Sequence, residues 1–301
     1  MTDDAPVDGD LVLPGNLTAR EGGVPRAWLA TLPALVAGVQ RRWGLDLSPP
    51  FQPGGQTAWV APARDARGRD LVLKVGWWHS EGRHEADGLR LWDGDGAVRV
   101  HAADVVGDGA EGWTSVLLLE RCRPGTTLAD RPEPDQDVVV AGLLRRLWVT
   151  PPAGHGIRPL QDMCDEWADS FERKRAAGRA TIDPGLARDG VALMRGLPAT
   201  ADRSVLLCTD IHAANVLTAQ REPWLVIDPK PHVGDPAYDP VQHMLNCSER
   251  LRADPLGLAR RMAGLLDLDP ERVRLWLFAR CVQESPDWPG LAEVARRVAP
   301  G

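Results

Sequence analysis

The sequence predicts an α+β protein with two lobes: an N-terminal lobe built on an antiparallel sheet with one helix, and a C-terminal lobe rich in helices. Between residues 51 and 120, short apolar runs alternate with turn residues, which is the pattern of strands in a sheet. Beyond residue 126, apolar residues recur at the spacing of amphipathic helices. This change of pattern divides the chain into residues 1–121 and residues 122–301.

The N-terminal lobe is expected to begin with partly irregular residues 1–24, followed by a helix. Apolar residues at helical spacing predict a core-packing helix over residues 25–43, ended by Gly44. Residues 51–75 predict a strand, a turn and a strand, with Gly54 and Gly55 between apolar strand residues. These glycines either form a simple hairpin turn or let the backbone approach phosphate groups.

Lys74 lies inside the apolar strand expected over residues 71–75, where an unpaired lysine is costly. A helix expected over residues 80–92 places Glu81 and Glu85 on one face, and Glu85 is the better partner because it lies deeper in the helix. In kinases, a strand lysine paired with a helix glutamate clamps the α- and β-phosphates of the nucleotide. The alternative is a buried salt bridge with a structural role only.

Two further strands are expected over residues 98–102 and 113–120, joined by a loop over residues 104–112. From Glu120 to Cys122 the chain then leaves the sheet toward the helical lobe. One interpretation is that backbone groups there face a nucleotide base in a cleft. The other is that Glu120 is an ordinary strand end.

The C-terminal lobe is expected to contain helices over residues 135–148, 160–179, 185–196, 240–252, 256–266, 270–283 and 291–298. Four acids, Asp162, Asp165, Glu166 and Asp169, crowd the start of the second of these helices. Acids at a helix N-terminus favour the helix dipole, so capping explains them at least as well as cation binding does.

The stretch from Leu207 to Asp228 carries the residues on which the chemistry depends. Asp210 is followed by four intervening residues and Asn215. A hairpin-like pair of apolar runs comes next, and Asp228 closes the second run. Phosphoryl transfer to a hydroxyl needs one carboxylate to orient the hydroxyl, plus an amide oxygen and a second carboxylate to hold magnesium. Asp210 fits the first role, and Asn215 with Asp228 fits the second. The spacing alone is weak, since Asp and Asn are ordinary turn residues.

Composition limits the classes of function. At 301 residues and 44% hydrophobic content, the chain is long enough to bury a sizeable core. A formal charge of −7 argues against a nucleic-acid binder and suits a cationic small molecule, although acidity also serves solubility alone. The acidic start and the lack of a long apolar run predict a cytoplasmic protein with no membrane partner. We also expect a monomer.

Cysteine and lysine usage adds two expectations. The five cysteines are odd in number and widely spaced, which excludes paired zinc-knuckle spacing and predicts reduced, mostly buried thiols. Only three of the 35 basic residues are lysines: Lys74, Lys174 and Lys230. Because arginine is used nearly everywhere else, each lysine raises the question of what needs a compact ammonium.

With Lys74, Glu85, Asp210, Asn215 and Asp228 in this order, the chain resembles the aminoglycoside phosphotransferase family, antibiotic kinases with a protein-kinase-like fold. Within the family, the chain resembles the streptomycin kinase and hydroxyurea phosphotransferase branch. This narrower resemblance depends on the runs DPK at 228–230 and GDPAYD at 234–239, and on residues 89–99 and 118–121. The resemblance covers residues 25–250.

The resemblance implies a bilobal fold, ATP as phosphoryl donor, magnesium (Mg2+) and a small hydroxyl-bearing acceptor. Asp210 would be the catalytic base, Asn215 and Asp228 the magnesium ligands, and Lys74 with Glu85 the phosphate clamp.

The resemblance also implies roles for other residues, on a looser match. Gly54 and Gly55 would belong to the loop over the phosphates. Glu120 and Cys122 are assigned to the nucleotide site by their place at the end of the strand, independently of the resemblance. His212 would position either the acceptor or the catalytic loop. In the GDPAYD run, Asp235 and Asp239 would brace the C-terminal lobe.

The chain departs from the family at Cys208-Thr209, where His-Gly is usual. The histidine usually shapes the catalytic loop through hydrogen bonds, so Cys208 would loosen that loop. The glycine that Thr209 replaces would have been needed for its backbone angles. Neither replacement removes a chemical group from the transfer itself.

The sequence thus predicts a kinase that transfers the ATP γ-phosphate to a hydroxyl of an aminoglycoside-type antibiotic (streptomycin-like) or of hydroxyurea, giving antibiotic resistance. One alternative is a kinase for a sugar or a biosynthetic metabolite. The other is a nucleotide-binding pseudokinase, which the complete set of Lys74, Asp210, Asn215 and Asp228 disfavours.

Overall fold

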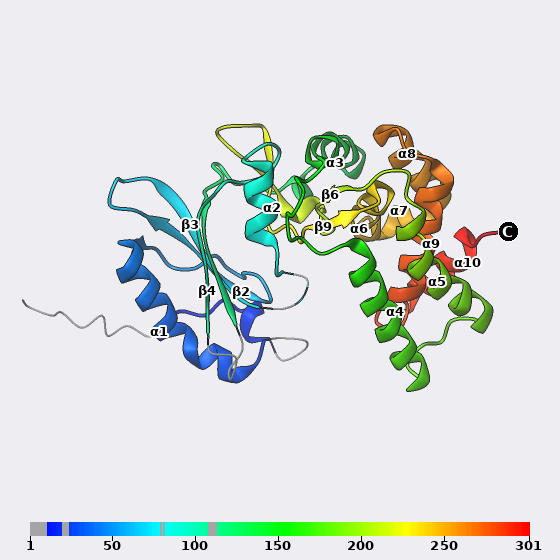
Figure 1. Ribbon diagram of the computed structural model, residues 1–301, viewed down its shortest axis with the longest axis horizontal. Helices are drawn as coiled ribbons and strands as arrows, with labels where there is room; N and C mark the ends of the chain where they lie inside the picture. Colours follow the sequence, from blue (N-terminus) through cyan, green and yellow to red (C-terminus); the bar gives the residue numbers. More distant parts are fainter. Residues whose placement is uncertain (1–10, 20–23, 79, 81, 108–112) are drawn as a thin grey trace, which may run out of the picture. The chain divides into compact units, whose positions relative to one another are not determined.

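The computed structural model describes residues 11–19, 24–78, 80, 82–107 and 113–301 (Figure 1). By their contacts the residues form two compact units, Met1–Ala86 with Arg99–Arg121, and Asp87–Val98 with Cys122–Gly301. The second unit therefore includes Asp87–Val98, which the sequence-based division assigned to the first lobe.

The first unit is built on a five-stranded antiparallel sheet with the strand order β1-β2-β3-β5-β4. The strands are β1 (Asp46–Leu47), β2 (Ala58–Arg64), β3 (Asp70–Trp77), β4 (Val100–Val106) and β5 (Thr114–Glu120). Helix α1 (Arg26–Trp43) packs along this sheet (Figure 1). Its Trp28, Leu32, Val36 and Val39 share one buried cluster with sheet residues such as Leu73. Because side chains alternate along a strand, the neighbouring Lys74 points to the opposite face.

Several expectations for the first unit are confirmed, and two need correction. Helix α1 ends at Gly44, whose φ of 62° lies in the left-handed region that glycine adopts readily. Strand β4 extends to Val106, so the loop expected from residue 104 begins later, and residues 108–112 lie outside the described part. The helix expected over residues 80–92 is shorter. It is α2 (Glu85–Trp92), preceded by a turn in which the Glu85 N–H donates to the Gly82 carbonyl.

The second unit is mainly helical. Its helices are α3 (Glu133–Leu147), α4 (Leu160–Ala176), α5 (Pro184–Gly196), α6 (Pro240–Asn246), α7 (Ser248–Ala253), α8 (Pro255–Leu266), α9 (Pro270–Glu284) and α10 (Gly290–Val298). The helix expected over residues 240–252 is in fact two helices, since Cys247 has the non-helical angles φ −83° and ψ 55°. Helix α9 lies at the centre, packed against α5, α8 and α10.

Two short antiparallel pairs of strands accompany these helices. Strand β6 (Val205–Leu207) pairs with β9 (His232–Gly234), and β7 (Val216–Thr218) pairs with β8 (Trp224–Val226). The second pair is the hairpin that the apolar runs predicted, whereas the β6–β9 pairing had no local signal. Short 3-10 helices complete the two units: η1 (Asn16–Thr18), η2 (Leu128–Asp130), η3 (Pro198–Thr200), η4 (Ala213–Asn215) and η5 (Pro236–Tyr238).

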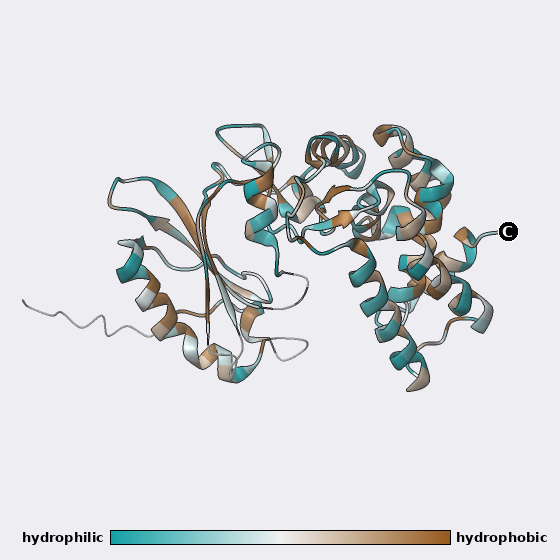
Figure 2. Ribbon diagram, in the orientation of Figure 1, coloured by the Kyte–Doolittle hydropathy of each residue, from teal (hydrophilic) through white to brown (hydrophobic). Residues whose placement is uncertain are grey.

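The distribution of hydrophobic residues agrees with the layers of each unit. Figure 2 shows hydrophobic residues along the strands of the five-stranded sheet and hydrophilic residues over the surfaces of the helices. Cys164, Cys208, Cys247 and Cys281 are buried free thiols, as expected for reduced cysteines. Among the described residues, no helix combines the length and the apolar content that crossing a membrane requires.

Candidate active site

The predicted base, Asp210, lies at the start of the loop that joins β6 to β7 in the second unit. This loop is held at its far end by Asn215, whose Nδ2 donates to the Asp210 carbonyl over 3.1 Å. The Asn215 carbonyl in turn accepts from the N–H of Ile227 at 2.9 Å. Because the amide nitrogen of Asn215 is engaged, its amide oxygen is the atom that can ligate a cation.

Asp228 follows strand β8 directly and has a φ of 51°. Aspartate tolerates this left-handed conformation better than most residues. Burial lowers the pKa of His212, while the charges of Asp210 and Asp228 oppose this effect and Lys230 adds to it. These residues therefore share one electrostatic environment, in which His212 is neutral at pH 7. Carboxylate and amide oxygens gathered in this way are the ligands that magnesium prefers.

Lys230 was not assigned a role from the sequence, although its rarity as a lysine was a signal. Its ammonium forms an ion pair with Oδ2 of Asp210. The two side chains are 22% and 19% exposed, so the pair is partly shielded from water but open to a small ligand.

The backbone of Cys208 and Thr209 is held by a buried carboxylate. Thr209 has a φ of 52°, which confirms that this position needs angles that glycine adopts more readily. Asp239 accepts hydrogen bonds from the backbone N–H groups of Cys208 at 3.1 Å and Thr209 at 2.6 Å, and from Nε1 of Trp148 at 2.9 Å. Burial raises the pKa of Asp239 to about 6, although these three donors act to lower it. Asp239 thus braces the residues directly before the base.

Asp235 has a similar bracing position. Its carboxylate accepts from Nε of Arg272 and from Nε1 of Trp276, both at 2.6 Å. Another oxygen caps η5 by accepting from the N–H of Ala237 at 2.9 Å. These contacts tie η5 to helix α9 in the core of the second unit.

In the first unit, the structure brings Lys74 and Glu85 together. Lys74 Nζ lies 2.8 Å from Oε1 and 2.6 Å from Oε2 of Glu85, and both side chains are buried. Glu85 is the first residue of α2 rather than a residue deeper in the helix, and a carboxylate at that end favours the helix dipole. Glu81, the alternative partner, lies outside the described residues.

The glycine pair has a structural explanation at one of its two positions. Gly54 has a φ of 75°, and a Cβ there would lie 2.5 Å from Cβ of Pro14. Nδ2 of Asn16 also donates to the Gly54 carbonyl at 2.8 Å. At Gly55, a Cβ would meet only the Ala58 carbonyl, at 3.9 Å. Packing within the first unit therefore accounts for Gly54 but not for Gly55.

The connector residues fall in different units. Oε2 of Glu120 accepts from the N–H of Arg99 at 3.0 Å within the first unit, and Arg121 there pairs with Asp70 at 2.8 Å. Cys122 is half-buried and belongs to the second unit. The side chain of Glu120 is thus used at the strand end, which leaves the backbone as the part of this connector that can contact a base.

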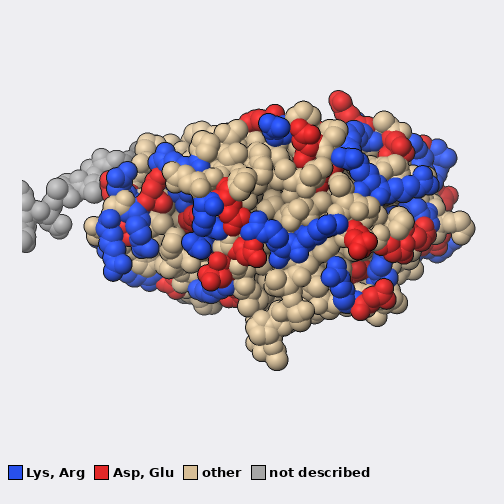
Figure 3. All heavy atoms as spheres, turned by 90° about the horizontal axis from the view of Figure 1, so that it is seen from above, with Lys and Arg blue, Asp and Glu red and all other residues tan. Residues whose placement is uncertain are grey.

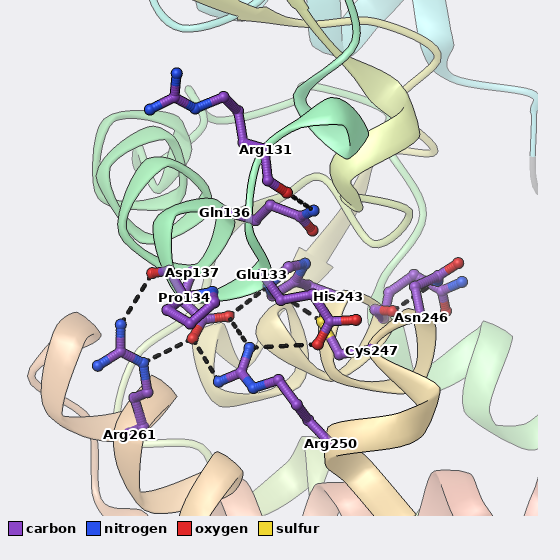
Figure 4. Close-up of polar contacts among 11 residues, drawn as sticks. Arg131, Glu133, Pro134, Gln136, Asp137, His243, Asn246, Cys247, Arg250 and Arg261 are labelled. Atoms are coloured by element: carbon purple, nitrogen blue, oxygen red, sulfur yellow. Dashed lines mark hydrogen bonds and ion pairs between the residues drawn. The ribbon is translucent and has the colours of Figure 1, made fainter.

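A second group of ligand-type side chains lies between helices α3 and α6. Asp137, His243 and Cys247 are buried and offer atoms within 4.8 Å of one another. Figure 4 shows, however, that the Asp137 carboxylate is surrounded by donors: Arg250 at 2.8 Å, Arg261 at 2.7 Å and His243 at 2.9 Å. These arginines already balance the buried charge, so the group is a salt-bridge network that joins α3 to α6, α7 and α8.

Charged groups at the surface are largely paired with each other. Figure 3 shows basic and acidic side chains lying next to one another over the face in view. The acids at the start of α4 follow this pattern: Arg158 lies 2.6 Å from Glu166, and Arg195 lies 2.6 Å from Asp169. Ion pairing therefore explains Glu166 and Asp169 without a bound cation.

The second unit also contains a pocket of about 450 Å³ formed by residues of α6, α7, α9 and α10. Its polar lining includes Gln242, Asn246, Arg280 and Glu284, beside the indole of Trp288. Trp288 is 67% exposed, so its ring is available to a ligand.

Comparisons with known proteins identify the family of the chain. The family described as aminoglycoside/hydroxyurea antibiotic resistance kinase matches residues 42–289. Streptomycin 6-kinase of Streptomyces griseus is 36% identical over 286 residues, which cover 89% of this chain and 86% of that protein. Hydroxyurea phosphotransferase of Kitasatospora aureofaciens is 37% identical over 270 residues, which cover 87% of this chain and 74% of that protein.

Solved structures confirm the expected protein-kinase-like fold. Aminoglycoside phosphotransferase APH(4)-Ia superposes with a TM-score of 0.60 at 18% identity, covering 90% of this chain and 100% of that one. Choline kinase LicA from Streptococcus pneumoniae gives a TM-score of 0.59 at 11% identity, covering 89% and 97%. The chain therefore belongs to the aminoglycoside/hydroxyurea antibiotic resistance kinase family, and it is an ATP-using phosphotransferase that acts on hydroxyl groups.

Proposed function

We propose that this protein transfers the γ-phosphoryl group of magnesium-bound ATP to a hydroxyl of streptomycin or a similar aminoglycoside. The observation that carries the proposal is the gathering of Asp210, Asn215 and Asp228 around one loop of the second unit. Asp210 orients the acceptor hydroxyl and accepts its proton, while Asn215 and Asp228 hold the magnesium ion. The magnesium neutralises charge on the phosphates when it is bound.

The remaining site residues are assigned to the nucleotide. Lys74, held by Glu85, contacts the phosphates, and Gly55 with Gly54 lies in the loop that covers them. The backbone from Glu120 to Cys122 receives the base. His212, neutral and beside Asp210, positions the loop or the acceptor. The buried free thiols of Cys164, Cys208, Cys247 and Cys281 favour a cytoplasmic site of action.

The acceptor is inferred from relatives, which are named for streptomycin and for hydroxyurea. The acceptor hydroxyl must reach Asp210, and none of the residues that line the pocket beside Trp288 belongs to the loop that carries Asp210, so the acceptor is not assigned to that pocket.

The experiment that tests the proposed function uses Asp210→Asn. Magnesium-dependent ATP consumption is first screened over streptomycin, other aminoglycosides, hydroxyurea and simple amino sugars. Asp210→Asn should keep the rise in melting temperature caused by MgATP, while transfer falls roughly a hundredfold or more because a positioned base is lost. Phosphorylated acceptor is measured by mass spectrometry.

Three outcomes would change the assignment. If Asp210→Asn loses the melting shift, Asp210 supports the fold or the nucleotide site. If transfer is unchanged, the base lies elsewhere. If the wild type binds MgATP but phosphorylates nothing in the panel, a pseudokinase is the better description.

A further inference from the structure

Lys230 occupies a position that the proposed chemistry does not yet explain. Its ammonium pairs with Oδ2 of the proposed base, Asp210, and both groups are mostly but not fully buried. The proposed base is assigned to the acceptor hydroxyl, so an ammonium already in contact with it needs a role of its own in the reaction.

The backbone of Lys230 is held firmly against the residues that precede the base. Its N–H donates to the Cys208 carbonyl at 2.9 Å. Its carbonyl accepts from Oγ1 of Thr209 and from Nδ1 of His232, the latter at 3.0 Å. The following residue, Pro231, packs so closely on Gly88 of α2 that a Cβ there would lie 2.3 Å from Cγ of the proline. Lys230 is thus fixed relative to Asp210 by main-chain contacts, independently of the ion pair.

The choice of lysine is informative in this chain. Only three of its 35 basic residues are lysines, and its other ion pairs are made mostly by arginine. Arginine binds one carboxylate with a planar fork, whereas a lysine ammonium is a compact charge with three donors. An ammonium can therefore contact a carboxylate and the oxygens of a phosphoryl group at the same time.

We propose that Lys230 is a catalytic residue whose ammonium contacts the oxygens of the phosphoryl group during transfer. This inference rests on the proposed function. In the transfer, a lone pair of the acceptor hydroxyl oxygen forms the new O–P bond, and the bond from the γ-phosphorus to the bridging oxygen of ADP breaks with its electron pair going to ADP. The hydroxyl proton passes to Asp210. Lys230 stays protonated throughout and stabilises charge on the transferred oxygens.

A structural ion pair is the competing explanation, and the two differ in what they affect. If the ion pair only orients Asp210, replacing Lys230 should have no further effect once Asp210 is replaced by the neutral asparagine. A contact with the phosphoryl oxygens persists without the Asp210 charge. The Lys230 ammonium should also contact a mimic of the transferred group, such as aluminium fluoride bound beside MgADP.

The test measures Lys230→Met, Lys230→Gln and the control Lys174→Met, which removes a lysine paired with Asp287 away from the site. Readouts are kcat and KM with streptomycin, and the melting shift with MgADP alone and with MgADP plus aluminium fluoride. We expect both Lys230 variants to keep the MgADP shift, to lose the additional shift from aluminium fluoride, and to lose roughly a hundredfold or more in kcat, as for removal of one preorganised donor. Lys174→Met should behave as wild type.

The same aluminium fluoride measurement in an Asp210→Asn background separates the explanations. In that background, Lys230→Met should still abolish the additional melting shift from aluminium fluoride. The inference is wrong if Lys230→Met leaves that shift unchanged. It is also wrong if Lys230→Met or Lys230→Gln keeps more than a third of the wild-type kcat. If Lys230→Met does not fold, Lys230→Gln decides alone. A wild type without a nucleotide shift or transfer would refute the proposed function itself, and this inference with it.

Discussion

The backbone N–H of Thr209 donates a 2.6 Å hydrogen bond to the buried carboxylate of Asp239. Asp239 also accepts from the N–H of Cys208 and from Trp148, so it binds the end of the loop before Asp210 to helix-rich parts of the second unit. The main-chain N–H groups of Cys208 and Thr209 thus hold the loop through an acid that lies far along the chain.

The first prediction concerns the pH dependence of this carboxyl group. Burial raises the pKa of Asp239 from 3.8 to about 6, so the ionised form is costly in the folded protein. Its contribution to stability should be fully present below pH 3.8 and should be lost as the pH rises through about 6, up to ~3 kcal/mol at 1.36 kcal/mol per pKa unit. Urea unfolding of wild type and Asp239→Asn at pH 4.5 and 7 measures this difference. If the stability of wild type relative to Asp239→Asn increased with pH, the hydrogen bonds from the three donors would outweigh the effect of burial on the pKa of Asp239.

The second prediction concerns strain at Thr209, a β-branched residue with a φ of 52°. Thr209→Val keeps the strain and loses the hydrogen bond to the Lys230 carbonyl, so we expect a loss of about 1 kcal/mol or more in the free energy of unfolding. Thr209→Gly loses the same bond but releases strain of about 1–3 kcal/mol, and should be the more stable of the two. Denaturant midpoints measured side by side give the order. A less stable glycine variant would show that the backbone is not strained here.

The third prediction concerns the ion pair in the first unit. Lys74→Ala should raise KM for ATP or depress kcat, because the ammonium positions the phosphates. Glu85→Ala should act in the same direction but less, since the lysine remains. Steady-state kinetics over ATP concentration make the comparison, with Glu81→Ala alongside. If Glu81→Ala has the larger effect, Glu85 is not the functional partner of Lys74.

The fourth prediction concerns the proposed magnesium ligand. Asp228→Ala should abolish magnesium-dependent turnover and leave the fold intact, because the metal neutralises charge on the transferred group. Asp267→Ala is a matched control, since Asp267 also has a left-handed backbone, with φ 57° compared with 51° at Asp228. Turnover is measured against magnesium concentration, with circular dichroism for the fold. Near-normal transfer by Asp228→Ala at saturating magnesium would remove Asp228 from the metal site.

The fifth prediction concerns the salt-bridge network of Figure 4. Asp137→Asn removes the carboxylate that binds Arg250 and Arg261 and should cost about 1–3 kcal/mol in stability, because both arginines stay partly exposed to water. Asp135→Asn, on the same helix but exposed, should cost less than about 1 kcal/mol.

The salt-bridge network around Asp137 should also make the free energy of unfolding depend on pH. Burial alone would raise the pKa of Asp137, but hydrogen bonds from His243, Arg250 and Arg261 outweigh it and hold the pKa below 3.8. The stability from Asp137 is therefore present above pH 3.8 and should be lost as the pH falls below it. The difference between wild type and Asp137→Asn, measured by urea unfolding from pH 7 to 3, should shrink toward acid. A constant difference would contradict this assignment.

The sequence by itself determined the elements and the order of the chemical groups. The period of apolar residues located α1, β3 and the β7–β8 hairpin, because those patterns depend on neighbours within a few residues. The order of Lys74, Asp210 and Asp228 indicated phosphoryl transfer, since each role needs a particular side chain at a particular place along the chain.

Only the tertiary structure decided which distant residues meet. The β6–β9 pairing, the contact of Asp239 with Thr209, the network around Asp137 and the ion pair of Lys230 with Asp210 all join segments well separated along the chain. No local spacing encodes such contacts, because they form when packing of whole helices and strands brings buried charges to their partners. The left-handed backbone at Thr209 is decided in the same way, by hydrogen bonds that only the folded second unit supplies.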